Sequence, residues 1–145
     1  MNKYDLVVCG GGTAGVAAGY IAAKYGLKTL IVEKNIHLGG AITSSLVIPA
    51  MKSNHKNINC EFYNDFIDEL SKYNGQITYC DGNRGWFNPE LTKIALDSLM
   101  QNVGCDVIYD AEVKNVIIIY RRVIFFRHNR RCKFFKNFKH KIFRK

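Results

Sequence analysis

The residues of this chain that are best suited to chemistry are three glycines and one acid near its start. Gly10, Gly12 and Gly15 have the spacing G-x-G-x-x-G, and Glu33 follows about 20 positions after the first of them. Such glycines let backbone N–H groups come close to a pyrophosphate, and such an acid accepts hydrogen bonds from a ribose hydroxyl. The pattern predicts dinucleotide binding. The alternative is that the glycines only form a tight turn.

Two strands and a helix are needed to position these residues. Apolar runs predict strands at Leu6–Cys9 and Thr29–Val32, and the small residues after Gly12 predict a helix between them. In this βαβ unit Gly10 allows the turn out of the first strand, and Gly15 lets the helix pack closely on the sheet. The first N–H groups of the helix have no partners within it and can bind the pyrophosphate. The acid would repel a 2′-phosphate, which disfavours an NADP-type ligand.

The segment after this unit is predicted to be a long loop followed by a helix. Residues 34–56 contain paired glycines, hydroxyl side chains and at most a short helix, and a loop in this position lies near the ligand. Residues 57–73 have the apolar period of an amphipathic helix. Its acids are expected on the solvated face rather than in a reactive site: Glu61, Asp65, Asp68 and Glu69.

The next segment completes the predicted domain. Residues 74–87 are expected to be irregular, with a packed Trp86, an exposed Arg84 and a short strand at 77–80. Asn88-Pro89-Glu90 is a strong helix start, and Gly104 supplies the stop. Residues 105–109 and 113–119 are β-type runs. This order predicts an α/β fold: a three-layer, Rossmann-like domain with a largely parallel sheet, incomplete in this chain.

Composition limits the classes of protein that remain. The chain has 145 residues, enough for one domain with a core. No apolar run approaches the roughly 20 residues that span a bilayer, and the early first strand leaves no room for a signal peptide, so we expect a cytoplasmic protein. The five cysteines lack metal-ligand spacing, which predicts no metal site. Cys9 and Cys105 lie in strand runs and are expected to be buried.

The net charge of +9 comes entirely from the last part of the chain. Residues 120–145 contain eleven Lys and Arg, six Phe and no acid, with no clear helical or strand period. We therefore divide the chain into a domain at 1–119 and a basic aromatic tail at 120–145. We favour a frameshifted or truncated reading frame, which leaves a disordered tail. A membrane-surface segment and a nucleic-acid-binding tail are the alternatives, and nucleic acid is not expected as a partner of the domain.

The motifs together resemble the N-terminal region of the FAD-dependent oxidoreductase family of two-dinucleotide-binding-domain flavoproteins. The resemblance rests on GGGTAGVAAG, LIVEK, LGGAITSSLV and FNPELTKIALDSLMQNVGCDVIYDAEV, and it covers about residues 3–118. It implies FAD as the cofactor. It also implies a role for the following residues in cofactor binding: Gly10, Gly12, Thr13, Ala14, Gly15, Glu33, Lys34, Gly39, Gly40, Thr43 and Val113.

The resemblance assigns a part of the cofactor to several of these residues. The first glycines surround the pyrophosphate, Glu33 binds the ribose of the AMP half, and the backbone of Val113 meets the adenine. Gly39, Gly40 and Thr43 lie along the cofactor. The family commonly has a glycine where this chain has Ser45, and its late flavin-binding motif and substrate domain have no counterpart here.

Three hypotheses follow for the function. The first is the FAD-binding portion of an oxidoreductase that passes hydride or electrons through the flavin, with catalytic residues, substrate, electron partner and oligomeric state unknown. The second is a nucleotide-binding remnant without activity. The third is a basic module that works through its tail, by contact with a membrane surface or a nucleic acid.

Overall fold

A computed structural model describes residues 4–45, 48–50, 60–80, 82, 84–119, 122–127 and 135–137. The helices are α1 (Thr13–Lys24), α2 (Ala41–Ser44), α3 (Cys60–Lys72) and α4 (Pro89–Asn102). The strands are β1 (Leu6–Cys9), β2 (Thr29–Val32), β3 (Gln76–Ile77), β4 (Trp86–Phe87), β5 (Asp106–Ile108), β6 (Val113–Ile119), β7 (Arg122–Arg127) and β8 (Phe135–Asn137).

The centre of the fold is a parallel sheet of three strands in the order β1-β2-β5. Leu6 pairs with Thr29 and Cys9 with Val32, so the two strands of the βαβ unit run side by side for their whole length. On the other side of β2, Leu30 pairs with Asp106. The predicted α/β fold with a parallel sheet is confirmed. The third strand of the sheet, β5, comes from more than 70 residues later in the sequence than β2, its partner.

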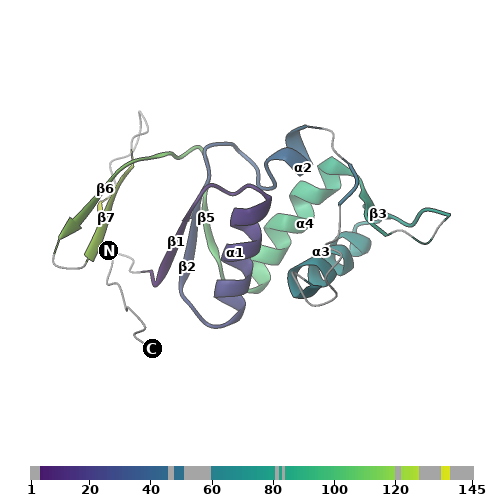
Figure 1. The fold of residues 1–145 in the computed structure, drawn as a ribbon, viewed down its shortest axis with the longest axis horizontal. Helices are drawn as coiled ribbons and strands as arrows, with labels where there is room; N and C mark the ends of the chain where they lie inside the picture. The colour runs from purple at the N-terminus through teal and green to yellow at the C-terminus, as the bar shows by residue number, and fades with distance from the viewer. Residues whose placement is uncertain are drawn as a thin grey trace.

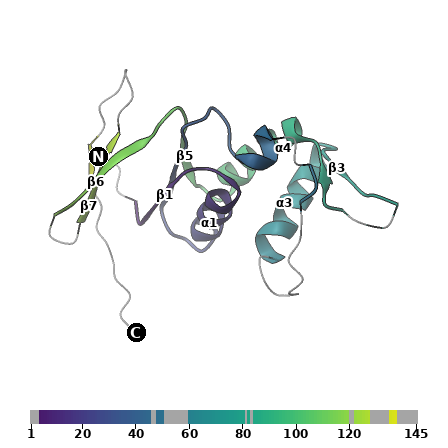
Figure 2. The same ribbon diagram turned by 45° about the horizontal axis from the view of Figure 1, so that its top comes forward.

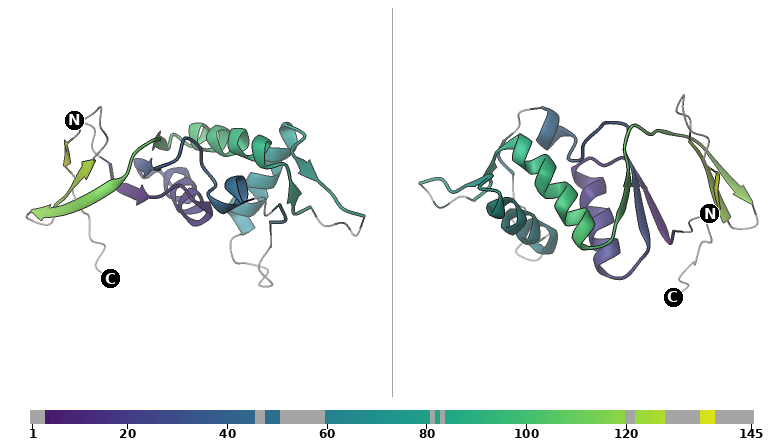
Figure 3. Two further views of the ribbon diagram at one scale, coloured as in Figure 1. Left: turned by 90° about the horizontal axis from the view of Figure 1, so that it is seen from above. Right: turned by 180° about the vertical axis from the view of Figure 1, so that it is seen from behind.

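Helices cover one face of this sheet and a second sheet lies on the other side (Figure 1). Helices α1, α4 and α3 follow one another outward from the parallel strands, while β6 and β7 lie opposite them. The same separation appears when the molecule is tilted (Figure 2) and when it is seen from above and behind (Figure 3). The third layer is thus an antiparallel sheet, β6-β7-β8, rather than a second layer of helices.

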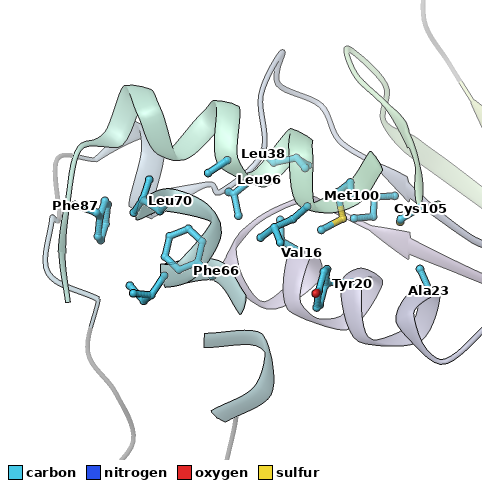
Figure 4. Packing of buried hydrophobic residues seen from close by; sticks show 14 residues of the cluster. Val16, Tyr20, Ala23, Leu38, Phe66, Leu70, Phe87, Leu96, Met100 and Cys105 are labelled. Atoms are coloured by element: carbon cyan, nitrogen blue, oxygen red, sulfur yellow. The ribbon is translucent and has the colours of Figure 1, made fainter. Parts of the chain in front are cut away.

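The main core lies between the parallel sheet and the helices (Figure 4). Val16 and Tyr20 of α1 meet Leu96 and Met100 of α4, with Ile31 of β2 beneath them, and all five side chains are buried. Three aromatic rings, two from α3 and one from β4, extend this core. The Phe66 ring stacks on Phe62 at 6.1 Å and meets Phe87 edge-on at 6.4 Å. Burial of this apolar surface is the main stabilising term for the domain.

A smaller apolar cluster lies on the opposite face of the parallel sheet. Tyr4 and Leu30 are buried there, and Val7, Val32 and Ile108 pack against them. Both faces of the parallel strands are therefore apolar, which agrees with the continuous hydrophobic runs of β1, β2 and β5.

The helix signals after residue 60 are confirmed, with one exception. Asn88 caps α4, because its Oδ1 accepts hydrogen bonds from the N–H groups of Glu90 and Leu91. The exception is Glu69, which was expected on the solvated face of α3 and is buried. It lies between α3 and α4, where Ser98 Oγ and Lys72 Nζ donate to its carboxylate at 2.6 Å and 2.7 Å.

The segment between α3 and α4 is more regular than its sequence suggests. Strands β3 and β4 form a short antiparallel hairpin, in which Ile77 pairs with Trp86. Trp86 is partly buried and stacks on Tyr79 at 5.5 Å, and Arg84 is largely exposed, with its guanidinium 3.7 Å from Asp68 Oδ1. The expectation of an irregular segment is wrong for Gln76, Trp86 and Phe87, because strands of two residues are too short to show a period in the sequence. The strand predicted at 77–80 is confirmed only at Ile77, where β3 ends.

Two further expectations need correction. Cys105 is buried as predicted, but Cys9 is exposed, since it ends β1 and β1 is at the edge of the sheet. The sequence shows no strand period after residue 119, yet residues there form β7. Arg122 in β7 pairs with Ile119 in β6, across the boundary predicted between the domain and the tail. No helix within the described ranges is both long and apolar enough to cross a membrane.

Candidate cofactor-binding site

The carboxyl ends of the three parallel strands meet at one edge of the sheet, and the predicted site residues follow them. Gly10 N–H, after β1, donates to Val32 O at 2.8 Å, and Glu33 N–H, after β2, donates to Ile108 O at 2.9 Å. The backbone of Ala111, after β5, returns to Glu33 O at 2.9 Å. Ligands of open α/β sheets bind at this edge of the strands.

The loop from Gly10 to Gly12 leaves open space where a ligand would approach. A Cβ added to Gly10 or to Gly12 would meet no atom within 4 Å. Gly12 is the N-cap residue of α1, and because it has no side chain it makes no capping hydrogen bond. The first hydrogen bond within the helix runs from Val16 N–H to Gly12 O. The N–H groups of Thr13, Ala14 and Gly15 therefore have no partner within the helix, and the positive end of the helix dipole lies beside the open space.

In contrast to Gly10 and Gly12, Gly15 is closely surrounded by other atoms. A Cβ on Gly15 would clash with the carbonyl oxygen of Gly10 and would lie 3.2 Å from Val8 Cγ1. The sequence predicts this role, close packing of the helix on the strand, and the structure shows the geometry that requires it. The missing side chain brings the start of α1 directly against the turn after β1.

The second pair of glycines lies against the first loop. Gly39 N–H donates to Gly11 O at 2.8 Å, and the hydroxyl of Thr13 donates to Gly39 O at 3.2 Å. A Cβ on Gly40 would come within 3.0 Å of the Gly12 Cα. Two segments that are separated in the sequence by a helix and a strand thus form one continuous backbone surface, in which Gly11 and Gly39 are buried and Gly10, Gly12 and Gly40 are partly exposed.

The carboxylate of Glu33 is buried beneath this surface and bound to the backbone. Glu33 is only 5% exposed. Its Oε2 accepts a hydrogen bond from Gly11 N–H at 2.5 Å, and its Oε1 accepts one from Asn35 N–H at 2.8 Å. A carboxylate has about four acceptor positions, so two remain after these bonds. The ribose role expected from the sequence is compatible with this acceptor count and stays a prediction.

The other predicted residues occupy different surroundings. Thr43 is buried, and its hydroxyl donates to Leu38 O at 2.7 Å, so it supports the loop from within. Lys34 is exposed beside the acid, and Val113 is half-buried at the start of β6, two residues after the Ala111 N–H that binds Glu33 O. The glycines, Glu33 and Thr13 are thus brought together, with Thr43 behind them.

Two residues that the sequence reasoning missed complete the site. Gly11, the middle glycine, binds Glu33 through its N–H, and a Cβ there would clash with Leu38 Cδ2. Leu38 is fully buried and lies beside Leu96 of α4 (Figure 4). For Gly11 the available signal was a glycine at the middle position of the Gly10–Gly12 run, because the motif itself leaves that position unrestricted.

Two groups that flank β5 have shifted pKa values because of packing contacts. Burial raises the pKa of the Cys105 thiol to about 11, helped by Asp106. Burial and the hydrogen bond to Asp97 raise the pKa of the Tyr109 hydroxyl above its usual range. In the part of the chain that the structure describes, no group of three or more His, Cys, Asp and Glu could hold a metal ion. We assign no catalytic residue to the described site.

The fold and the site define a dinucleotide-binding protein: parallel strands, a glycine turn into a helix, and an acid after the second strand. The chain belongs to the FAD dependent oxidoreductase family, whose model matches residues 5–134. FAD is the cofactor of this family, and the residues present fit it, because the space beside Gly10 and Gly12 is open and the adjacent helix N–H groups have no partner within α1. The match extends past residue 119, beyond the region on which the resemblance was based.

The matches to individual relatives cover only a small part of each relative's length. A digeranylgeranylglycerophospholipid reductase of Methanococcus vannielii is 39% identical over 66 residues, which are 46% of this chain and 17% of that protein. A 3-oxosteroid 1-dehydrogenase of Mycolicibacterium smegmatis is 39% identical over 75 residues, 50% of this chain and 12% of that protein. This chain therefore spans a small share of the curated relatives that it matches.

Solved structures support the fold. A flavoprotein/dehydrogenase from Cytophaga hutchinsonii superposes with a TM-score of 0.65 at 18% identity, over 94% of this chain and 38% of that one. A geranylgeranyl bacteriochlorophyll reductase-like protein from Thermoplasma acidophilum gives a TM-score of 0.56 at 21% identity, over 98% and 38%. The described residues therefore share the fold of the matched part of each of these proteins.

Proposed function

We propose that this chain is the cofactor-binding front of an FAD-dependent oxidoreductase and that it holds the ADP half of FAD. The observation that carries the proposal is the open space beside Gly10 and Gly12, next to helix N–H groups that lack partners within α1. An anionic pyrophosphate there would gain backbone hydrogen bonds and the favourable end of the helix dipole. Bound flavin would supply the hydride or electron transfer.

The remaining predicted residues take supporting roles in this proposal. Glu33 accepts a ribose hydroxyl with its free acceptor positions, and Lys34 lies beside it. The backbone of Val113 meets the adenine; in support, Ala111, two residues before it, donates its N–H to Glu33 O. Gly39 and Gly40 line the cofactor, while Thr43 holds their loop from below through Leu38 O.

The decisive test is the substitution Gly12→Ala. Gly12 has φ of −68°, and an added Cβ would meet nothing within 4 Å, so the ligand-free fold should tolerate the methyl group. Affinity for ADP and FAD should fall about tenfold or more, since overfilling a packed contact costs roughly 1–3 kcal/mol. Titration calorimetry measures ADP, and flavin fluorescence quenching measures FAD. Unchanged affinity for both would refute the site.

A matched pair of variants separates the site from backbone strain. Gly10 and Gly26 have φ of 102° and 85°, and neither has an atom within 4 Å of an added Cβ. Alanine at either position should therefore strain the backbone to a similar extent, roughly 1–2 kcal/mol. Gly26 lies just after the other end of α1. Gly10→Ala should weaken ADP binding much more than Gly26→Ala at equal loss of stability.

Catalysis by the whole protein is part of the proposal, because the chain spans less than half of each solved relative named above. The competing function is a nucleotide-binding remnant. Binding of ADP without any binding of FAD would favour the remnant. Binding of FAD, with flavin that a reductant bleaches and air restores, would favour the oxidoreductase portion. A cytoplasmic location also belongs to the proposal, since Cys9, Cys80 and Cys105 are free thiols.

A second candidate function concerns the basic segment 120–145, whose eleven Lys and Arg without an acid favour an anionic surface. Binding of the full chain to vesicles containing phosphatidylserine should be lost when residues 120–145 are deleted. Vesicle binding that survives the deletion would exclude this role. The nucleotide sequence after the codon for Ile119 tests the frameshift hypothesis, because an out-of-frame continuation encoding a late flavin motif would support it.

A further inference from the structure

Gly11 is held from three sides by the segment that follows β2. Its N–H donates to Glu33 Oε2 at 2.5 Å, and its carbonyl oxygen accepts from Gly39 N–H at 2.8 Å. On the third side, the space that a Cβ would need is filled by Leu38 Cδ2, with Glu33 Cβ at 3.3 Å. We call these four residues, Gly11, Glu33, Leu38 and Gly39, the Gly11 clasp.

The clasp is anchored in the core rather than on the surface. Leu38 is fully buried, and its carbonyl oxygen accepts the Thr43 hydroxyl at 2.7 Å. The second carboxylate oxygen of Glu33 is held by Asn35 N–H at 2.8 Å, so the acid has little rotational freedom. A hydrogen bond to a buried charged acceptor is also stronger than one between neutral groups. The middle peptide of the loop is therefore held in place before any ligand arrives.

The neighbours of Gly11 have the opposite environment. An added Cβ on Gly10 or Gly12 would point into open space, while a Cβ on Gly11 between them would meet Leu38 and Glu33. Fixing the middle residue of a three-residue loop leaves the two outer peptides little freedom to turn. A preformed loop loses less conformational entropy on binding than a mobile one.

We propose that Glu33 is a positioning residue for the pyrophosphate loop in addition to its ribose role, and that the Gly11 clasp preforms this loop in the ligand-free protein. This inference rests on the proposed function. It implies that one carboxylate couples recognition of the ribose to recognition of the pyrophosphate. Removing the charge at position 33 should then weaken the binding of a ligand whose ribose offers no hydroxyls.

The test compares ADP with 2′,3′-dideoxy-ADP on the full chain and on Glu33→Gln. Glutamine is similar in shape but has one acceptor oxygen, so its NH₂ group would face one of the two N–H donors that now bind the carboxylate. If Glu33 only binds the ribose, Glu33→Gln lowers the affinity for ADP and leaves that for dideoxy-ADP unchanged. If the clasp preforms the loop, affinity for dideoxy-ADP also falls, by about tenfold for one lost charged hydrogen bond.

Glu112→Gln is the matched control. Glu112 is an exposed acid one residue after Ala111, paired with Lys114 at 2.5 Å, and it has no bond to the glycine loop. Its substitution removes the same charge near the site, which by itself should favour an anionic ligand slightly. Equal losses of dideoxy-ADP affinity in the two variants would overturn the proposal.

Hydrogen exchange on the unsubstituted chain provides a second measurement that needs no variant. The clasp predicts that the Gly11 amide is protected before ligand is added, compared with the amide of Ile36, an 81% exposed residue in the loop between β2 and α2. In Glu33→Gln the protection of Gly11 should fall while that of Val8 and Ile31 in the sheet persists, which a merely structural role would not produce. A Gly11 amide that exchanges as fast as that of Ile36 in the ligand-free protein would overturn the inference.

The two proposals fail separately. Gly12→Ala with unchanged ADP affinity would remove the site itself. Gly12→Ala with lost ADP affinity, together with an unprotected Gly11 amide, would keep the site and reject the clasp.

Discussion

Gly15 at the start of α1 lies directly against the backbone of Gly10: a Cβ on Gly15 would clash with the Gly10 carbonyl oxygen and lie 3.1 Å from its carbonyl carbon. The oxygen cannot easily move, because the same residue is tied to Val32 O through its N–H at 2.8 Å. One missing side chain thus sets how closely the helix dipole approaches the glycine loop.

Gly15→Ala should therefore destabilise the fold, in contrast to Gly12→Ala. Overpacking against fixed backbone costs typically about 1–3 kcal/mol, and here the contacted atom is not the end of a flexible side chain. Urea denaturation followed by circular dichroism measures the free energy of unfolding. Gly12→Ala serves as the control with open space. Equal stability of the two variants would show that the helix approaches the turn less closely than described.

The cap of α4 gives a second prediction. Asn88 Oδ1 accepts hydrogen bonds from Glu90 N–H at 2.9 Å and Leu91 N–H at 3.2 Å. Asn88→Ala should lower the free energy of unfolding by about 1 kcal/mol, because two donors at the helix start lose their partner. Asn88→Asp keeps an acceptor oxygen and should retain most of the stability. If both variants unfold at the same urea concentration, the cap contributes nothing.

The contact between α1 and α3 should depend on acid pH. Lys24 Nζ donates to Asp65 Oδ2 at 2.6 Å and holds the pKa of Asp65 below its usual range, against the opposing effect of burial. A carboxyl whose pKa is lower in the folded state stabilises the fold above its unfolded pKa, and this contribution is lost as the pH falls through the folded pKa. Stability should therefore decrease below about pH 4.

Lys24→Met tests this dependence. The substitution should lower the free energy of unfolding at pH 7 and flatten its decrease between about pH 5 and 3, measured by urea denaturation in a pH series. Lys93→Met is the control, since Lys93 pairs with Glu90 at 2.7 Å within α4 alone. An unchanged acid dependence in Lys24→Met would argue against a stabilising contact between the two helices.

Thiol reactivity should distinguish the cysteines. Cys105 is buried and its pKa is raised to about 11, so at pH 8 it is almost entirely a protonated thiol. Cys9 and Cys80 are exposed, although partial burial also raises the pKa of the Cys9 thiol and should slow its reaction. Iodoacetamide should modify Cys9 and Cys80 in the folded protein and Cys105 only after denaturation, as read by peptide mass spectrometry. Early modification of Cys105 would mean that the start of β5 opens readily.

Local signals in the sequence account for the elements that were predicted correctly. The apolar runs of β1 and β2, the glycine turn and the Asn88 cap depend on neighbours within a few residues, so their types and spacing identify them. The position of Glu33 after β2 follows for the same reason. Even the close approach of Gly15 was predictable, because the motif describes a recurring backbone shape.

Tertiary contacts decided the rest. Glu69 has the period of an exposed acid, yet it is buried because α4 brings Ser98 within 2.6 Å of it. Cys9 lies in an apolar run, yet it is exposed because β1 is the edge strand. The importance of Gly11 depends on Leu38 and Glu33, which reach it only after the chain has formed α1 and β2. The sequence by itself determined the βαβ unit and its ligand class, since these depend on local geometry. The structure decided which groups hold the loop, because partners more than 20 residues apart meet only in the folded chain.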